Sequence, residues 1–127
     1  FATAIAFLVP LTLDVIPAPA QARREPGELK LNRGVFLQAG DLQAHAESLL
    51  QRHGLRLDPA GVPLRIEAGS GPGESYRLRV TPAGASIEAE SAAGARLGLH
   101  TFLQLAQNGS IPAVEINDRP RFAWRGL

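Results

Sequence analysis

The sequence of 127 residues contains no cysteine and no methionine, and its aromatic side chains are few: one tryptophan, one tyrosine and five phenylalanines. Without cysteine, the chain has neither a disulfide framework nor a metal site made of thiolates. Without methionine, it also has no initiator residue ahead of Phe1. A chain that starts at Phe1 without an initiator is more easily interpreted as a fragment or a processed product than as a complete gene product.

Runs of like charge are also missing. Lysine and arginine together number 13, aspartate and glutamate number 12, and the formal net charge is +1, with the arginines scattered among the acids. Proteins that bind nucleic acid carry clustered basic residues, so nucleic acid is not predicted as a partner. The length suffices for one domain with a modest core, whereas an eight-stranded (β/α)₈ barrel alone needs about 250 residues.

No apolar run is long enough for a membrane-spanning helix, which needs about 20 residues. Residues 1–13 are uncharged, but Pro10 lies within them and Asp14 follows. This pattern is typical of the tail of a secretory signal peptide and predicts a secreted or periplasmic protein. Two cleavage positions stay open, one after the small-residue pattern Ala20-Gln21-Ala22 and one nearer Thr12.

In the second half of the chain, residues 76–90 have the alternating pattern of a β-hairpin. Its inward positions are predicted to be Tyr76, Leu78, Val80, Ile87 and Ala89. The outward acids Glu88 and Glu90 are expected across from the outward arginines Arg77 and Arg79. The turn is Thr81-Pro82-Ala83-Gly84, and the glycine is expected to adopt a positive φ.

A helix is predicted from Ser91, as its N-cap, to about Gln107, with Asn108-Gly109 as its stop. One apolar stripe is expected along Leu97, Thr101 and Leu105. Gly94 and Gly98 lie beside this stripe, and each costs roughly 1 kcal/mol of helix propensity relative to alanine. We therefore expect the helix to approach a sheet closely at these two glycines.

The first half of the chain predicts two strands and a helix. Residues 23–27 are interpreted as a loop, residues 28–32 as a strand that residues 35–37 continue, and residues 64–68 as a second strand. The helix is expected from the cap Asp41 to His53, with Gly54 closing it. Residues 69–73, rich in glycine, are interpreted as a flexible connection because a strand and not a helix follows them.

This order of elements predicts an α+β fold, a two-layer sandwich in which a mostly antiparallel sheet carries both helices on one face. The sheet is mixed if the first strand-helix-strand unit pairs in parallel. The three histidines, His45, His53 and His100, are too far apart to clamp one metal ion and are interpreted as solvated side chains.

The second helix and the segment after it resemble the end of the N-terminal domain of the family 20 glycoside hydrolases, the β-N-acetylhexosaminidases. In that family a helix Ala-x-Gly-x-x-x-Gly-x-x-Thr-x-x-Gln-Leu precedes Ile-Pro, an acidic strand and Pro-Arg-Phe-x-x-Arg-Gly, at the entry to the catalytic barrel. The matching stretches are Ala92–Leu105 and Ile111–Leu127. Val15-Ile16-Pro17-Ala18-Pro19 resembles the opening Ile-Pro-x-Pro element of the family, which favours cleavage nearer Thr12.

The resemblance implies three parts. Residues 1–12 would be a remnant of a signal peptide, residues 13–118 an accessory domain, and residues 119–127 the start of a missing (β/α)₈ catalytic domain. Three arginines, with Phe122 and Trp124 between them, are interpreted as an interdomain seam in preference to a stacking site for sugars or single-stranded nucleic acid. These arginines are Arg119, Arg121 and Arg125.

The enzyme implied by the resemblance removes terminal N-acetylglucosamine or N-acetylgalactosamine from the non-reducing ends of glycans or chitin oligomers. It uses a retaining mechanism assisted by the substrate. The catalytic Asp-Glu pair of the family lies in the barrel, and neither Asp-Glu nor Glu-Asp occurs in this sequence. We therefore predict no catalytic, cofactor-binding or metal-binding residue here, an inactive chain when it is alone, and the catalytic barrel and a glycan as partners.

Two other functions stay open from the sequence. The chain would also suit a helper domain of another glycosidase family, or a free-standing module that binds glycans. The residues after Leu127 distinguish the first of these, because family 20 continues with an apolar strand, an aspartate and Arg-His.

Overall fold

The computed structural model describes residues 21–106 and 109–119. Its strands are β1 (Gln21–Lys30), β2 (Val35–Gln38), β3 (Val62–Ala68), β4 (Tyr76–Thr81), β5 (Gly84–Ala89) and β6 (Ser110–Asp118). Its helices are α2 (Gln43–Arg52) and α3 (Ala92–Leu105), and a short 3-10 turn, Gly40–Leu42, precedes α2.

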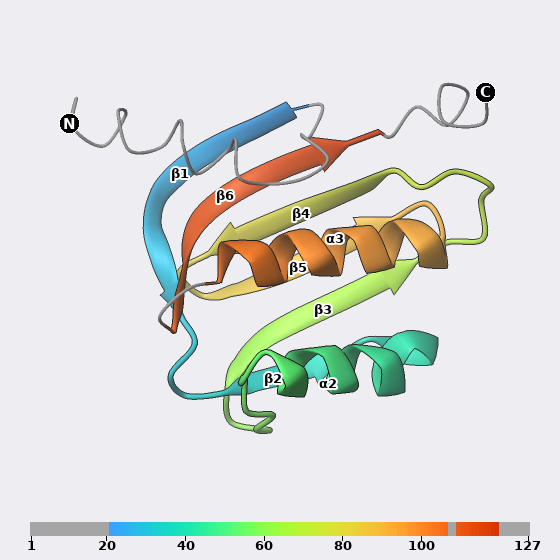
Figure 1. Cartoon of the computed structure of the whole chain (residues 1–127). Helices are drawn as coiled ribbons and strands as arrows, with labels where there is room; N and C mark the ends of the chain where they lie inside the picture. The colour runs from blue at the N-terminus through green and yellow to red at the C-terminus, as the bar shows by residue number, and fades with distance from the viewer. Residues whose placement is uncertain (1–20, 107–108, 120–127) are drawn as a thin grey trace.

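The described strands form one six-stranded sheet in the order β1-β6-β4-β5-β3-β2. Both helices lie on one face of this sheet (Figure 1). The pairings β1–β6, β6–β4 and β4–β5 are antiparallel, whereas β5–β3 and β3–β2 are parallel. The predicted α+β two-layer sandwich is confirmed, and so is the parallel pairing within the β2-α2-β3 unit. The second parallel pair joins strands that are not consecutive in the chain, and the sequence pattern did not indicate it.

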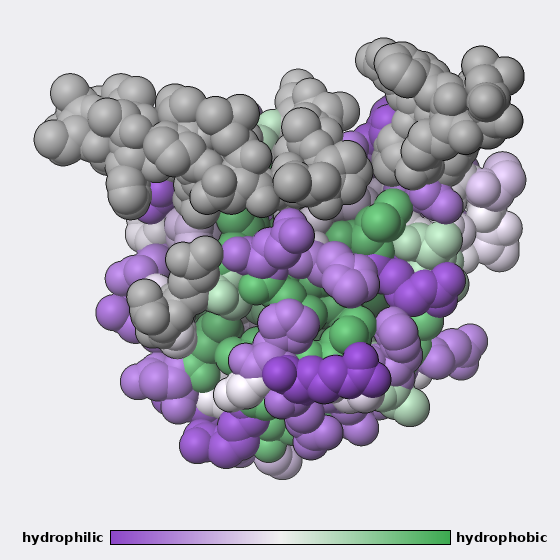
Figure 2. Space-filling model, viewed as in Figure 1, coloured by the Kyte–Doolittle hydropathy of each residue, from purple (hydrophilic) through white to green (hydrophobic). Residues whose placement is uncertain are grey.

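The core fills the space between the sheet and the helices. β4 alternates between buried and exposed residues along its whole length, as predicted from Tyr76, Leu78 and Val80. The side chains with no exposed surface include Leu50 of α2, Leu78 of β4, Ile87 of β5 and Phe102 of α3. Seen from the helix side, apolar side chains remain visible between the polar ones that cover most of this face (Figure 2).

Helix α3 begins as the sequence predicts. The backbone N–H of Gly94 donates to Ser91 Oγ at 3.2 Å, so Ser91 is the N-cap. The two helix glycines approach the sheet, as expected. A Cβ atom at Gly94 would lie 2.7 Å from the backbone oxygen of Ser75. The stripe predicted along Leu97, Thr101 and Leu105 is only partly right, because Leu97 is half-buried and the sheet-facing side includes both glycines and Phe102.

Strand β1 is longer than predicted. Residues 23–27, interpreted as a loop, belong to it, and the pairing with β6 shifts register between Arg24 and Glu28. The extra residues include Pro26, which cannot donate a ladder hydrogen bond, and Gly27, whose φ is +95°. Edge strands tolerate proline and glycine at such bulges, which is why a loop-like sequence forms a strand here.

We predicted that residues 35–37 continue the first strand. Instead, β2 lies at the opposite edge of the sheet from β1. The chain turns at Gly34, whose φ is +89°, and then crosses to the other edge of the sheet. The prediction of Asp41 as the cap of the following helix is wrong. Asp41 lies within the 3-10 turn, and the N-cap of α2 is Leu42, which forms no side-chain cap bond. Instead Gln43 reaches back, accepting from the Ala39 N–H at 2.8 Å and donating to the Leu37 carbonyl at 3.1 Å. Its amide thereby satisfies backbone groups at the edge of β2.

The β4–β5 hairpin turns at the predicted residues, with Thr81 paired to Gly84. The positive φ expected at Gly84 is wrong, because the positive-φ glycines among the described residues are five others. A Cβ atom at Gly84 would lie 2.7 Å from Pro63 Cγ on β3. Glycine is needed here because two strands approach closely, not because the turn is left-handed.

Some predictions lie outside the described residues. These are the signal-peptide remnant at residues 1–12, both cleavage positions, the opening Ile-Pro-x-Pro element, and Arg121, Phe122, Trp124 and Arg125 of the interdomain seam. Neither described helix has the length and apolar character needed to cross a membrane.

Candidate functional site

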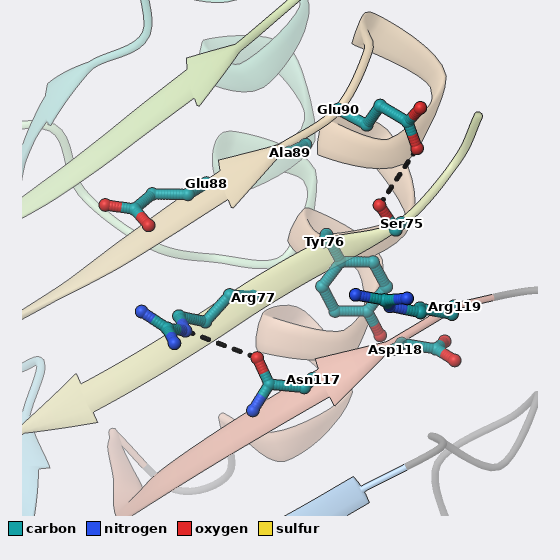
Figure 3. A pocket seen from close by; sticks show the side chains of 9 residues that line it. All are labelled: Ser75, Tyr76, Arg77, Glu88, Ala89, Glu90, Asn117, Asp118 and Arg119. Atoms are coloured by element: carbon teal, nitrogen blue, oxygen red, sulfur yellow. Dashed lines mark hydrogen bonds between the residues drawn. The ribbon is translucent and has the colours of Figure 1, made fainter. Parts of the chain in front are cut away.

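A hollow opens where β4 begins and where β5 and β6 end, at the place where the chain leaves the sheet (Figure 3). Its volume is about 740 Å³. The lining residues come from these three strands and the segments next to them: Ser75, Tyr76, Arg77, Glu88, Ala89, Glu90, Asn117, Asp118 and Arg119. Arg119, the one seam residue that the structure describes, is exposed at its rim.

The charges of the hairpin pair differently from the prediction. Arg77 does lie opposite Glu88, but Arg79 lies opposite Ser86 and not opposite Glu90. Arg77 Nε donates to Asn117 Oδ1 at 3.2 Å and lies 3.5 Å from a carboxylate oxygen of Glu115, both on β6. β4 is a central strand with neighbours on both sides, so its arginines have a choice of partners that a hairpin alone does not reveal.

Glu90 organises the glycine-rich loop at residues 69–73, which we had interpreted as a flexible connection. Ser75 Oγ donates to Glu90 Oε1 at 3.0 Å, and Gly71 N–H donates to the Glu90 carbonyl at 2.9 Å. A Cβ atom at Gly71 would lie 2.7 Å from Glu90 Cγ. The loop is therefore tied to the end of β5, and its glycines leave room for the Glu90 side chain. A strand follows it, as predicted, which argues against a phosphate site.

A buried polar group lies beneath the hollow. Tyr76 and Asp118 are cross-strand partners on β4 and β6, and each is 5% exposed. The Tyr76 hydroxyl lies 2.6 Å from Thr101 Oγ1 of α3. The pKa of Tyr76 is raised to about 12, mainly by burial; the hydrogen bond with Thr101 lowers it and the neighbouring Asp118 carboxylate raises it. The three side chains join the last residue of β6 to the neighbouring strand and to the helix layer.

Tyr76 is the only tyrosine, so its ionisation can be followed directly. We expect tyrosinate absorbance in the folded chain to appear only near pH 12, compared with about pH 10 for an unfolded tyrosine. The folded state holds the Tyr76 proton more tightly than the unfolded state does. The contribution of this group to the free energy of unfolding is therefore complete below pH 10. It is lost as the pH rises from 10 to 12, by about 3 kcal/mol in total. Spectrophotometric titration with and without denaturant checks this, and coincident curves would contradict it.

The histidines form no site in the described part of the chain. His45, His53 and His100 are all exposed, and His53 Nδ1 lies 3.0 Å from the Leu49 carbonyl oxygen at the end of α2. No group of three or more metal-ligating side chains comes together among residues 21–106 and 109–119. The absence of catalytic, cofactor and metal residues stays a prediction.

The hollow carries charges of both signs, Arg77 and Arg119 against Glu88 and Glu90. It is open and polar, and its residues make structural contacts with each other. This arrangement suits contact with another protein surface better than chemistry on a small molecule. Sequence reasoning missed the Tyr76–Asp118 pair. The alternation Val114, Ile116, Asp118 was a usable signal, because it places an acid on the buried face of β6.

The fold and the site define a small α+β sandwich domain with a polar end, from which the chain continues. Comparison with known proteins identifies it further. The family model described as "Glycosyl hydrolase family 20, domain 2" matches residues 12–119. The chain belongs to this family, and the resemblance seen in its motifs is confirmed.

Three similar proteins illustrate the relationship. A β-hexosaminidase subunit beta from Entamoeba histolytica is 44% identical over 72 residues, covering 51% of this chain and 12% of the relative. The structure of an N-acetyl-β-hexosaminidase from Streptomyces plicatus, in complex with Thio-NAglucal, matches 91% of this chain and 28% of that one, at 31% identity and a TM-score of 0.70. A GH20 β-N-acetylhexosaminidase from Streptomyces coelicolor A3(2) also matches 91% of this chain and 28% of that one, at 28% identity and a TM-score of 0.71.

Proposed function

We propose that this chain is the accessory N-terminal domain of a β-N-acetylhexosaminidase. The match of the family model to residues 12–119 carries the proposal. The names of the relatives support the activity, although the chain spans only 12% to 18% of the length of curated relatives such as those from Entamoeba histolytica and Porphyromonas gingivalis. The larger part of such a protein, including its catalytic barrel, then lies beyond this chain.

The proposed enzyme hydrolyses terminal, non-reducing N-acetylhexosamine residues of glycans or chitin oligomers. The oxygen of the 2-acetamido group attacks the anomeric carbon, one aspartate orients and stabilises the oxazolinium ion, and the adjacent glutamate acts first as acid and then as base. Because this sequence has no adjacent aspartate and glutamate, both carboxylates belong to the barrel. No residue of this chain takes part in the chemistry.

The role of this domain is structural. In the proposed enzyme the barrel follows this domain in the chain, so we expect the hollow at the end of β6 to face the barrel. The Tyr76, Asp118 and Thr101 side chains fix the end of β6 to the rest of the domain. A fixed exit gives the two domains a defined relative position, which a freely moving linker does not.

The full-length protein, with this chain and the residues that follow it, tests the activity. We expect it to hydrolyse p-nitrophenyl N-acetyl-β-glucosaminide and to release first the β-anomer of N-acetylglucosamine, because the mechanism retains configuration. Proton NMR during early turnover distinguishes the anomers. Release of the α-anomer, or no hydrolysis, would contradict the proposal. The uncharged residues 1–13 support a secreted or periplasmic location, so the activity is expected in the medium or the periplasmic extract of the source cells.

A further inference from the structure

The two edges of the sheet are β1 and β2 (Figure 1). An edge strand presents unpaired backbone groups, and proteins protect such edges with charged residues, proline or bulges, so that no strand of another molecule pairs there. β1 has all three devices, because it contains charged residues such as Lys30, and because Pro26 and Gly27 lie where its pairing with β6 shifts register. The sequence of β1 therefore protects its own edge.

β2 is short, which limits pairing, but it has none of these three devices. Its residues are Val35-Phe36-Leu37-Gln38, without charge or proline, and they pair with β3 in an unbroken register. Phe36 is 39% exposed, and no other large apolar side chain in the described part of the chain is as exposed. An uncharged, apolar edge of this kind favours pairing with another strand. Its protection has to come from outside β2.

A segment after α2 covers the beginning of this edge. The Val62 N–H donates to the Gly34 carbonyl at 3.0 Å, so the backbone groups of Gly34 and of the even-numbered residues of β2 face β3. Those of the odd-numbered residues face outward. The Val35 N–H donates to the Arg56 carbonyl at 2.8 Å, and the Val35 carbonyl accepts from the Asp58 N–H at 2.9 Å. This is the pattern of a parallel strand, but it is an isolated bridge and does not extend along β2.

Gln43 covers the rest of the edge with its side chain. Its Oε1 accepts from the Ala39 N–H at 2.8 Å, and its Nε2 donates to the Leu37 carbonyl at 3.1 Å. A residue of a parallel neighbouring strand makes the same two bonds, donating to one residue and accepting from the residue two positions later. Nε2 also donates to Glu47 Oε2 at 3.0 Å, which holds the amide in this orientation. The amide of Gln43 thus occupies the place of a peptide group in an additional strand.

We propose that Gln43 prevents the edge of β2 from pairing with the same edge in a second copy of this chain. Without the amide, each copy presents one acceptor, the Leu37 carbonyl, and one donor, the Ala39 N–H. In an antiparallel pair related by two-fold symmetry, the donors of one copy meet the acceptors of the other. The two Phe36 side chains then lie on the same face of the extended sheet and bury apolar surface. The inference is independent of the proposed function.

Sedimentation velocity of the 127-residue chain at several concentrations tests the proposal. Gln43→Ala removes the amide with its three hydrogen bonds and keeps a good helix former at this position. Because backbone groups on both copies become available for pairing, the dissociation constant of the dimer is expected to be at least about tenfold lower than in the unsubstituted chain.

Two further variants locate the association. Gln51→Ala is the matched control, because Gln51 is exposed on the same helix, and it should leave the dissociation constant unchanged. Phe36→Lys, added to Gln43→Ala, places a charge on the edge strand and should return the dissociation constant to that of the unsubstituted chain. Association through any other surface would not respond to a lysine at this edge.

The proposal is overturned if Gln43→Ala, folded by circular dichroism, associates no more strongly than the unsubstituted chain. It is also overturned if Phe36→Lys does not reverse the association. Hydrogen exchange of the Ala39 amide in the unsubstituted chain gives a test that needs no variant. We expect exchange at least about tenfold slower than in an unstructured peptide. Exchange at the unstructured rate would show that Gln43 does not occupy the edge, whether or not Gln43→Ala folds.

Discussion

Replacing Gly98 with leucine is expected to lower the free energy of unfolding by about 3 kcal/mol or more. Gly98 lies on the buried face of α3, and a Cβ atom there would meet Ile87 Cγ2 at 2.7 Å and a ring carbon of Tyr76 at 3.1 Å. Ile87 is fully buried and Tyr76 is 5% exposed, so neither side chain can move aside into solvent. A leucine would push α3 away from β4 and β5, and the core on both sides would lose contacts.

Urea unfolding of the 127-residue chain measures this, with the midpoint shifting and the slope unchanged. His100→Leu is the matched control, because His100 is exposed on the same helix and its substitution should change stability by about 0.5 kcal/mol or less. Gly98→Ala separates two effects. Alanine gains about 1 kcal/mol of helix propensity but meets the same close contacts, so a smaller net loss is expected. A stabilised Gly98→Ala would show that the helix can shift without cost.

Local patterns predicted the elements whose partners are near in the sequence. The alternation of Tyr76, Leu78 and Val80 predicted β4, and Ser91 predicted the start of α3. The cost of Gly94 and Gly98 in a helix predicted a close approach to the sheet, which the structure has. These features depend on period and on propensity, which a short stretch of sequence fully contains.

Features that depend on distant pairings were not predictable in the same way. β1 contains Pro26 and Gly27 and is a strand only because β6, more than 80 residues later, pairs with it around a bulge. The edge position of β2 and the partners of Arg77 likewise follow from the strand order. A local pattern indicates that a segment is extended, but it does not indicate which strand lies beside it.

In the candidate site, too, local patterns predicted some features and missed others. Arg119 lines the hollow at the end of β6, and its place at an interdomain seam stays a prediction. The buried Tyr76–Asp118 pair was missed, although an acid on the core side of a strand is a signal that alternation alone can give. Asp118 could have been predicted as a buried polar group, because it occupies an inward position of a strand that was expected to be acidic.

The second large effect concerns catalysis. The 127-residue chain is expected to show no hydrolysis of p-nitrophenyl N-acetyl-β-glucosaminide above the uncatalysed rate. Enzymes typically accelerate reactions by 10⁶-fold or more, so the difference from the full-length protein spans many orders of magnitude. The physical reason is the missing pair of adjacent carboxylates, without which neither the oxazolinium ion nor the leaving group is stabilised.

Glu88 and Glu90 are the carboxylates at the rim of the hollow, and Glu90 accepts from Ser75 at 3.0 Å. They are the acids of this chain most open to a catalytic interpretation. Removing a general acid or base costs a factor of about 10² to 10⁴ in rate. A chain with residual activity that disappears in Glu88→Gln or Glu90→Gln would therefore identify a catalytic group here.

The most direct test of the account is the turnover of this substrate by equal concentrations of the chain and of the full-length protein, measured side by side. We predict hydrolysis by the full-length protein alone. Sugar release by the chain itself, above a blank without protein, would contradict a purely supporting role for this domain.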